Sequence, residues 1–203
     1  MENPIVQLLS SSFFLMFIPT ANLMNNADYY KLKYNFAKFD NADAYRIHTV
    51  PEKISPTFLK EKITDNHLVI IENSLGSFVF SNVFTWDIFQ ILQRKYKEYR
   101  NFVFCADGTF GYFKILENGK IRRKIASEGC IQGITSYPEI RGLPCEHEYA
   151  HNMIYKMDWK AKYSADMLKN FGYTEIMMLI DYYIGLPRIA NEKIQNINIY
   201  EIK

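Results

Sequence analysis

The sequence predicts an α+β protein in which a mainly antiparallel sheet with hairpins is flanked by peripheral helices. Two turn dipeptides, Asp107-Gly108 and Asn118-Gly119, divide residues 101–129 into three strand-like segments. Both dipeptides tolerate the positive φ angles of a tight hairpin turn. Apolar residues elsewhere recur at helical spacing, and turn or capping residues mark the ends of these segments. We therefore expect hairpins at the centre of the fold and helices around them.

Alternation in the last two of these strands assigns side chains to the two faces of the sheet. Phe110, Tyr112 and Lys114 share one face of the strand that follows Asp107-Gly108. In the strand that follows Asn118-Gly119, period-2 geometry places the Arg123 guanidinium on the same face as isoleucines, where burial of a charge without a partner is costly. We expect either a carboxylate partner or a sheet-edge position from which the side chain reaches water. The alternation sets Lys120, Arg122 and Lys124 against Ile121, Arg123 and Ile125.

The N-terminal segment is predicted to contain a buried strand. Residues 13–18 are apolar at every position, as expected for a central strand covered on both faces. The longer apolar stretch 5–18 resembles an export signal, but no basic residue precedes it and three serines divide it. It is also too short to span a bilayer. These features favour the strand over the signal, and no membrane association is expected.

The remaining elements follow from periodicity and punctuation. Residues 84–99 carry apolar side chains at i, i+4, i+7 and i+8 and predict an amphipathic helix. Ser164 and Thr174 are expected N-caps of two helices near the C-terminus. Strands are expected at residues 67–72 and 77–82, and a loop rich in Gly and Pro at 130–144. The predicted helices occupy residues 20–39, 57–63, 84–99, 165–170 and 175–184, and an edge strand occupies 197–202.

Composition limits the class of protein. Hydrophobic residues form 48% of the 203 residues, which is enough for a core and excludes disorder on a large scale. We expect a single α+β domain over residues 1–203. A formal net charge of +2 gives no argument for nucleic acid or an anionic membrane as partner. The three cysteines are an odd number at wide spacings, which favours a reducing compartment and predicts a cytoplasmic location.

One short motif matches a zinc site. His147, Glu148 and His151 fit the pattern H-E-x-x-H, in which two histidines bind zinc and the glutamate acts as general base. The context is poor, because Pro144 lies three residues before the first histidine, where a catalytic motif would continue a helix. A third ligand is also needed, and the candidates are Asp166, Glu175 and Cys145. We favour a chain with no cofactor and no catalytic residue, and keep a zinc-dependent hydrolase as the alternative.

Other chemical signals are weaker. Cys105 lies within an apolar strand and is expected to be a buried small hydrophobe. Lys120, Arg122 and Lys124, beside Tyr112, could hold single-stranded nucleic acid by charge and stacking. A solvated strand face explains the same residues, because basic residues are spread along the chain. Nucleic acid is therefore an unlikely partner.

Residues 78–187 have a distinctive order of elements: an apolar strand, an amphipathic helix, two hairpin strands, a G-L-P-x-E step and a late helix before I-G-L-P. Within this order stand Phe110-Gly111-Tyr112, Asn118-Gly119, Arg123, Glu128-Gly129, Gly142, Pro144 and Glu146. In these features the chain resembles bacterial immunity proteins, the small cytosolic proteins encoded beside polymorphic toxins of contact-dependent or secreted systems.

The resemblance implies a function without catalysis. A protein of this kind binds the C-terminal domain of its cognate toxin and neutralises it by covering the active site or the path of the substrate. Arg123 and Glu146 would then be a structural ion pair that supports the sheet, and His147 and His151 would bind no metal. Immunity proteins against basic nucleases are commonly acidic, whereas this chain is slightly basic. The class of toxin therefore stays open.

Overall fold

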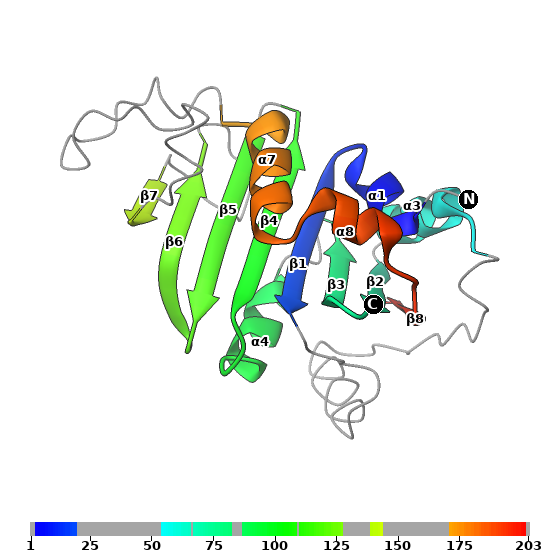
Figure 1. Cartoon of the computed structure of the whole chain (residues 1–203), viewed down its shortest axis with the longest axis horizontal. Helices are drawn as coiled ribbons and strands as arrows, with labels where there is room; N and C mark the ends of the chain where they lie inside the picture. Colours follow the sequence, from blue (N-terminus) through cyan, green and yellow to red (C-terminus); the bar gives the residue numbers. More distant parts are fainter. Residues whose placement is uncertain are drawn as a thin grey trace.

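An eight-stranded antiparallel sheet organises the fold (Figure 1). The computed structural model describes residues 3–19, 54–65, 67–82, 87–108, 110–127, 139–143 and 171–201. The strands follow the order β7-β6-β5-β4-β1-β3-β2-β8, and every neighbouring pair is antiparallel. The predicted α+β class is confirmed. The strands are β1 (Phe13–Pro19), β2 (His67–Asn73), β3 (Gly76–Ser81), β4 (Asn101–Asp107), β5 (Phe110–Glu117), β6 (Lys120–Ala126), β7 (Glu139–Gly142) and β8 (Asn196–Glu201).

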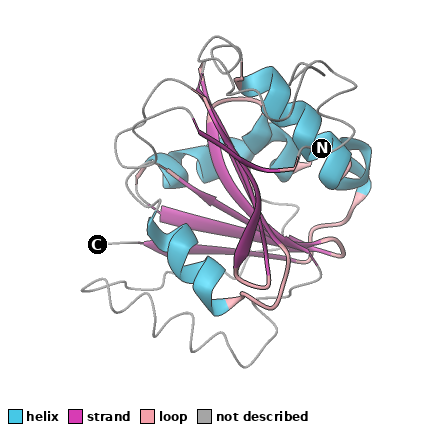
Figure 2. Cartoon of the chain, turned by 90° about the vertical axis from the view of Figure 1, so that its left-hand side faces the viewer, coloured by secondary structure: helices cyan, strands magenta, loops and turns pink. Residues whose placement is uncertain are grey.

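Helices cover both faces of this sheet (Figures 1 and 2). On the face that we call the α7 face pack α1 (Pro4–Leu9), α3 (Pro56–Thr64), α7 (Tyr173–Tyr183) and α8 (Leu186–Asn191). On the opposite face, the α4 face, packs α4 (Asp87–Lys95). Among the described residues, no helix combines the length and the apolar character needed to cross a bilayer.

The predicted central strand is confirmed in β1. Phe13, Leu15 and Phe17 belong to the buried cluster of the α7 face, whereas the residues between them belong to that of the α4 face. Successive side chains of a strand point to opposite faces, so only a strand covered on both sides can be apolar throughout. At the other end of the order, β8 is an edge strand, as predicted.

Local signals explain most helix positions. Pro56 and the N-cap Ser55 begin α3, which matches the predicted helix at 57–63. In α7 the helix begins two residues earlier than predicted, because the Glu175 carboxylate accepts a hydrogen bond from the Gly172 amide at 2.9 Å and replaces Thr174 as the cap. The predicted helices at 20–39 and 165–170 lie outside the described residues.

Three elements were not predicted from the sequence. Asn3 caps α1 by accepting from the Ile5 amide at 2.9 Å, and Pro4 occupies the first helical turn. Pro187 likewise occupies the first turn of α8. The third element, β7, lies within the predicted loop 130–144 and forms by pairing with β6, a contact that no local pattern of four residues encodes.

A β-bulge corrects the predicted faces of β6. Asn118 and Gly119 adopt φ angles of 51° and 72°, so the predicted tight turn is confirmed. Beyond it, Leu116 pairs with Ile121 whereas Ile115 pairs with Arg123. Two residues of β6 therefore lie opposite one residue of β5 at this point. The extra residue interrupts the period-2 alternation of β6. The predicted grouping is wrong for Ile121, which lies with Lys124 on the α4 face, whereas Arg123 shares the α7 face with Ile125 as predicted.

Gly111 of β5 provides a stability prediction. A Cβ atom at this position would lie 2.5 Å from the carbonyl oxygen of Phe171, a backbone atom that cannot move alone. We expect Gly111→Ala to lower the free energy of unfolding by about 1–3 kcal/mol, as overpacked core sites do. In the control Gly108→Ala the new methyl group meets nothing within 4 Å, and a φ of 57° costs about 1 kcal/mol. Urea unfolding measures both, and a larger loss in Gly108→Ala would contradict the packing explanation.

Candidate functional site

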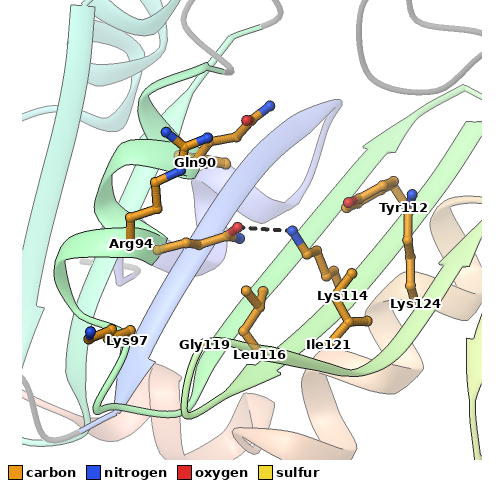
Figure 3. Close-up of a pocket in the computed structure, with 11 residues that line it drawn as sticks. Gln90, Arg94, Lys97, Tyr112, Lys114, Leu116, Gly119, Ile121 and Lys124 are labelled. Carbon is orange, nitrogen blue, oxygen red and sulfur yellow. Dashed lines mark hydrogen bonds between the residues drawn. The ribbon is translucent and has the colours of Figure 1, made fainter.

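A groove of about 680 Å³ lies between α4 and the β5–β6 hairpin, on the α4 face of the sheet (Figure 3). Its size is within the range of small-ligand and peptide sites. One wall comes from α4 and the turn after it, and the other from the two hairpin strands. The residues that line it are Phe89, Gln90, Gln93, Arg94, Lys97, Tyr112, Lys114, Leu116, Gly119, Ile121 and Lys124.

The charge of the groove is positive. Arg94 and Lys97 line it from the helix side, at the C-terminal end of α4, where the helix dipole favours cations. From the sheet side come Lys114 and Lys124, which are directly opposite each other in the β5–β6 pairing. No carboxylate, imidazole or thiol is among the lining residues of this groove in the described part of the chain.

Lys114 is the central charged group. Its Nζ atom donates to Oε1 of Gln93 at 3.0 Å, and the dashed line in Figure 3 marks this hydrogen bond. Gln93 is itself only 6% exposed, so the acceptor is fixed in place. The pKa of Lys114 is lowered to about 8, chiefly by burial and then by the nearby Lys124, whereas Glu139 acts in the opposite direction. Folding thus places a cation where its charge is poorly solvated.

Lys124 differs from Lys114 because it has an anionic partner. Its Nζ atom forms an ion pair with the Glu139 carboxylate of β7 and lies 5.7 Å from the centre of the Tyr112 ring. Burial acts to raise the pKa of Glu139, but its contacts with Lys124 and Arg141 outweigh this effect and lower it. The edge strand thus neutralises one of the four cations of the groove.

The rest of the lining is apolar or neutral. Leu116 and the 41% exposed Ile121 form an apolar strip between the charged ends. Burial, followed by the charges of Glu139 and Cys105, raises the pKa of the Tyr112 phenol, which stays protonated at neutral pH. The groove therefore combines cations, amides and apolar side chains. Cations and amides are the groups that bind an anion through charge-assisted hydrogen bonds.

Arg123 has a structural place outside the groove. The residue is 2% exposed, and its Nη1 atom donates to the carbonyl oxygens of Gly142 at 2.7 Å and Arg141 at 3.3 Å. These bonds fix β7 to β6. Gly142 adopts a φ of 80°, and a Cβ there would lie 1.9 Å from the Arg122 carbonyl oxygen. Glu146 is outside the described residues, so the ion pair with Arg123 stays a prediction.

The zinc motif also lies outside the described residues, which include neither His147, Glu148 and His151 nor the ligand candidates Cys145 and Asp166. Glu175 is described and caps α7. Within the described ranges, no group of three His, Cys, Asp or Glu residues is placed to hold a metal ion. Cys105 is buried as expected, and burial, with a smaller effect of Asp107, raises the pKa of its thiol.

Sequence reasoning found one wall of this groove only in part. It placed Lys114 on a face with Tyr112 and predicted the amphipathic helix at 84–99, but not that these segments meet. It also grouped Lys124 with Lys120 and Arg122, which do not line the groove because the bulge separates them. The available signal was a lysine on an otherwise aromatic strand face. The pairing of Lys114 with Lys124 depends on the bulge, because the tight turn alone would place Arg123 opposite Lys114.

No known family, no curated protein and no solved structure matches this chain.

Proposed function

We propose that this protein is an immunity protein that binds and neutralises the C-terminal domain of a cognate bacterial toxin without catalysing a reaction. The observation that carries the proposal is the groove between α4 and the β5–β6 hairpin. Its lining combines four cations with amides and apolar side chains. Such a surface serves recognition, because charge complementarity accelerates and orients the association of two proteins.

The resemblance to immunity proteins supports the same proposal. Its residues build the hairpin that forms one wall of the groove: Gly111 admits the Phe171 backbone, Tyr112 lines the groove, and Asn118-Gly119 makes the turn. Arg123 and Gly142 then attach β7, whose Glu139 holds Lys124. In this proposal the described residues of the set form the framework of a binding surface. A cytoplasmic location is part of the proposal, since the toxin must be met there.

The proposal predicts protection of cells. A large toxin gene is expected beside the gene of this protein, and co-expression should rescue cells from the C-terminal domain of that toxin. The purified proteins should form a direct complex with a Kd of roughly 1 nM, which an interface of about 1,200–2,000 Å² can reach. A toxin domain that kills despite co-expression, or that does not bind, would refute the proposal.

The alternative hydrolase is tested in the same assay. Glu148→Gln should rescue as well as the unaltered protein, and purified protein should contain no stoichiometric zinc. One zinc per chain, with an activity lost in Glu148→Gln, would favour the hydrolase instead.

A further inference from the structure

The groove contains positive charge that the described part of the chain leaves uncompensated. Arg100, Arg122 and Arg141 each form an ion pair with Glu117 or Glu139. No carboxylate in the described ranges is in ion-pair contact with Arg94, Lys97 or Lys114, three of the four cations in the groove. A half-enclosed concavity lined by one sign of charge concentrates the electrostatic potential and attracts the opposite sign.

The position of Lys114 adds a cost that a ligand would remove. Like charges directly opposite in a strand pair are destabilising, and Lys114 is directly opposite Lys124. Burial of an ammonium group costs further free energy unless it is paired, and within the described ranges the Lys114 Nζ atom bonds to the neutral Gln93 amide. Clusters of this kind occur where a protein sacrifices stability for a binding site.

We propose that this groove receives the carboxylate side chains of an acidic segment of the partner protein, with Arg94, Lys97 and Lys114 as the groups that contact them. The identity of that partner rests on the proposed function, whereas the carboxylate preference rests on the groove alone. The apolar strip of Leu116 and Ile121 fits the methylene groups of glutamate side chains and the backbone between them.

The lining favours a polypeptide over single-stranded nucleic acid. Nucleic-acid channels stack bases on exposed aromatic rings along a continuous basic track. The two aromatic residues here, Phe89 and Tyr112, are 1% and 4% exposed, so neither ring offers a stacking face. The hairpin lysine Lys124 is already paired with Glu139, which further shortens any basic track.

The test is an NMR titration of the ¹⁵N-labelled full chain with the peptide N-acetyl-tetraglutamate amide at low salt. We expect saturable shifts of backbone amides in α4, β5 and β6, with a Kd on the order of 0.1–1 mM. The affinity for the peptide should fall several-fold at about 0.5 M salt, where charges are screened beyond roughly 4 Å. The matching tetraglutamine amide peptide should not bind.

Two double variants with the same change in net charge locate the binding. Arg94→Gln/Lys114→Gln should weaken the peptide at least about tenfold, because both charged contacts are lost. Lys60→Gln/Lys62→Gln removes two cations of α3, on the opposite face of the sheet, and should leave the Kd unchanged. Equal affinity of both variants, or no saturation at about 10 mM peptide, would overturn the proposal.

The remaining arms separate the sources of an anion and the two proposals. Tighter saturation by inorganic phosphate or by an octathymidine oligonucleotide would assign the groove to phosphate and overturn the carboxylate preference. A toxin domain bound equally well by Arg94→Gln/Lys114→Gln would refute the groove while the immunity function stands. If the groove binds the acidic peptide but the protein binds no toxin, the immunity function is refuted while the carboxylate preference of the groove stands.

Discussion

Phe113→Ala should lower the free energy of unfolding by about 3–5 kcal/mol, the cost of deleting a large buried ring. Phe113 is fully buried, and its ring lies 5.3 Å from that of Phe104 and 5.4 Å from that of Tyr183. The stack joins β4, β5 and α7, so an alanine leaves a cavity between the sheet and the helix. Domains of this size are stable by only about 5–15 kcal/mol, and the loss is a large part of that.

Chemical unfolding followed by circular dichroism measures this effect. The control is Tyr182→Ala on the same helix, where the side chain is 48% exposed and the expected loss is below about 1 kcal/mol. Equal losses in the two variants would show that the aromatic stack does not attach α7 to the sheet. The test also bears on the groove, because β5 supplies both the stack on one face and Lys114 on the other.

Gln93→Leu/Lys114→Met should stabilise the protein by about 1–2 kcal/mol at pH 7. The pKa of Lys114 falls from 10.5 to about 8 on folding, so the native state disfavours its charged form. Replacing the buried pair with apolar residues of similar size removes that cost, here reduced by the water that reaches a half-buried group. Gln93→Leu alone should instead destabilise by about 1–3 kcal/mol, because the ammonium loses its acceptor.

The same pair predicts a pH dependence with a definite sign. Between pH 8 and 10.5 the unfolded chain keeps the Lys114 proton while the native state has released it. Since the unfolded state binds more protons, the free energy of unfolding contributed by this group rises with pH across that window and is constant below it. The double variant should lack this contribution. A double variant less stable than the unaltered protein at pH 7, with the same pH profile, would contradict a costly lysine.

The parts of the fold that sequence reasoning recovers are those encoded by neighbouring residues. The turn at Asn118-Gly119 is predicted from the sequence because it depends on a local φ preference. The strand β1 is predicted because all of its residues from Phe13 to Ile18 are apolar and buried. The strand β7 was missed, since four residues gain their structure from pairing with β6 and from the Arg123 hydrogen bonds. A contact formed across a gap in sequence has no local signature.

The bulge explains why the candidate site was predicted only in part. Period-2 alternation is correct for β5, and it places Lys114 with Tyr112. In β6 the bulge adds one residue, so the residues before and after it do not follow one continuous alternation. Ile121 therefore lies on the α4 face and lines the groove, and does not share a face with Arg123. The meeting of this face with α4 is a tertiary contact, which the periodicity of either element alone does not reveal.

Zero-length cross-linking of the complex tests the central claim most directly. A water-soluble carbodiimide joins a carboxylate to a lysine amine with loss of water, and only where the two groups touch. With the cognate toxin domain bound, we predict amide links from toxin Asp or Glu residues to Lys97 and Lys114 in the groove. A stable complex whose links involve only lysines on the opposite face, such as Lys60 and Lys62 of α3, would contradict the account.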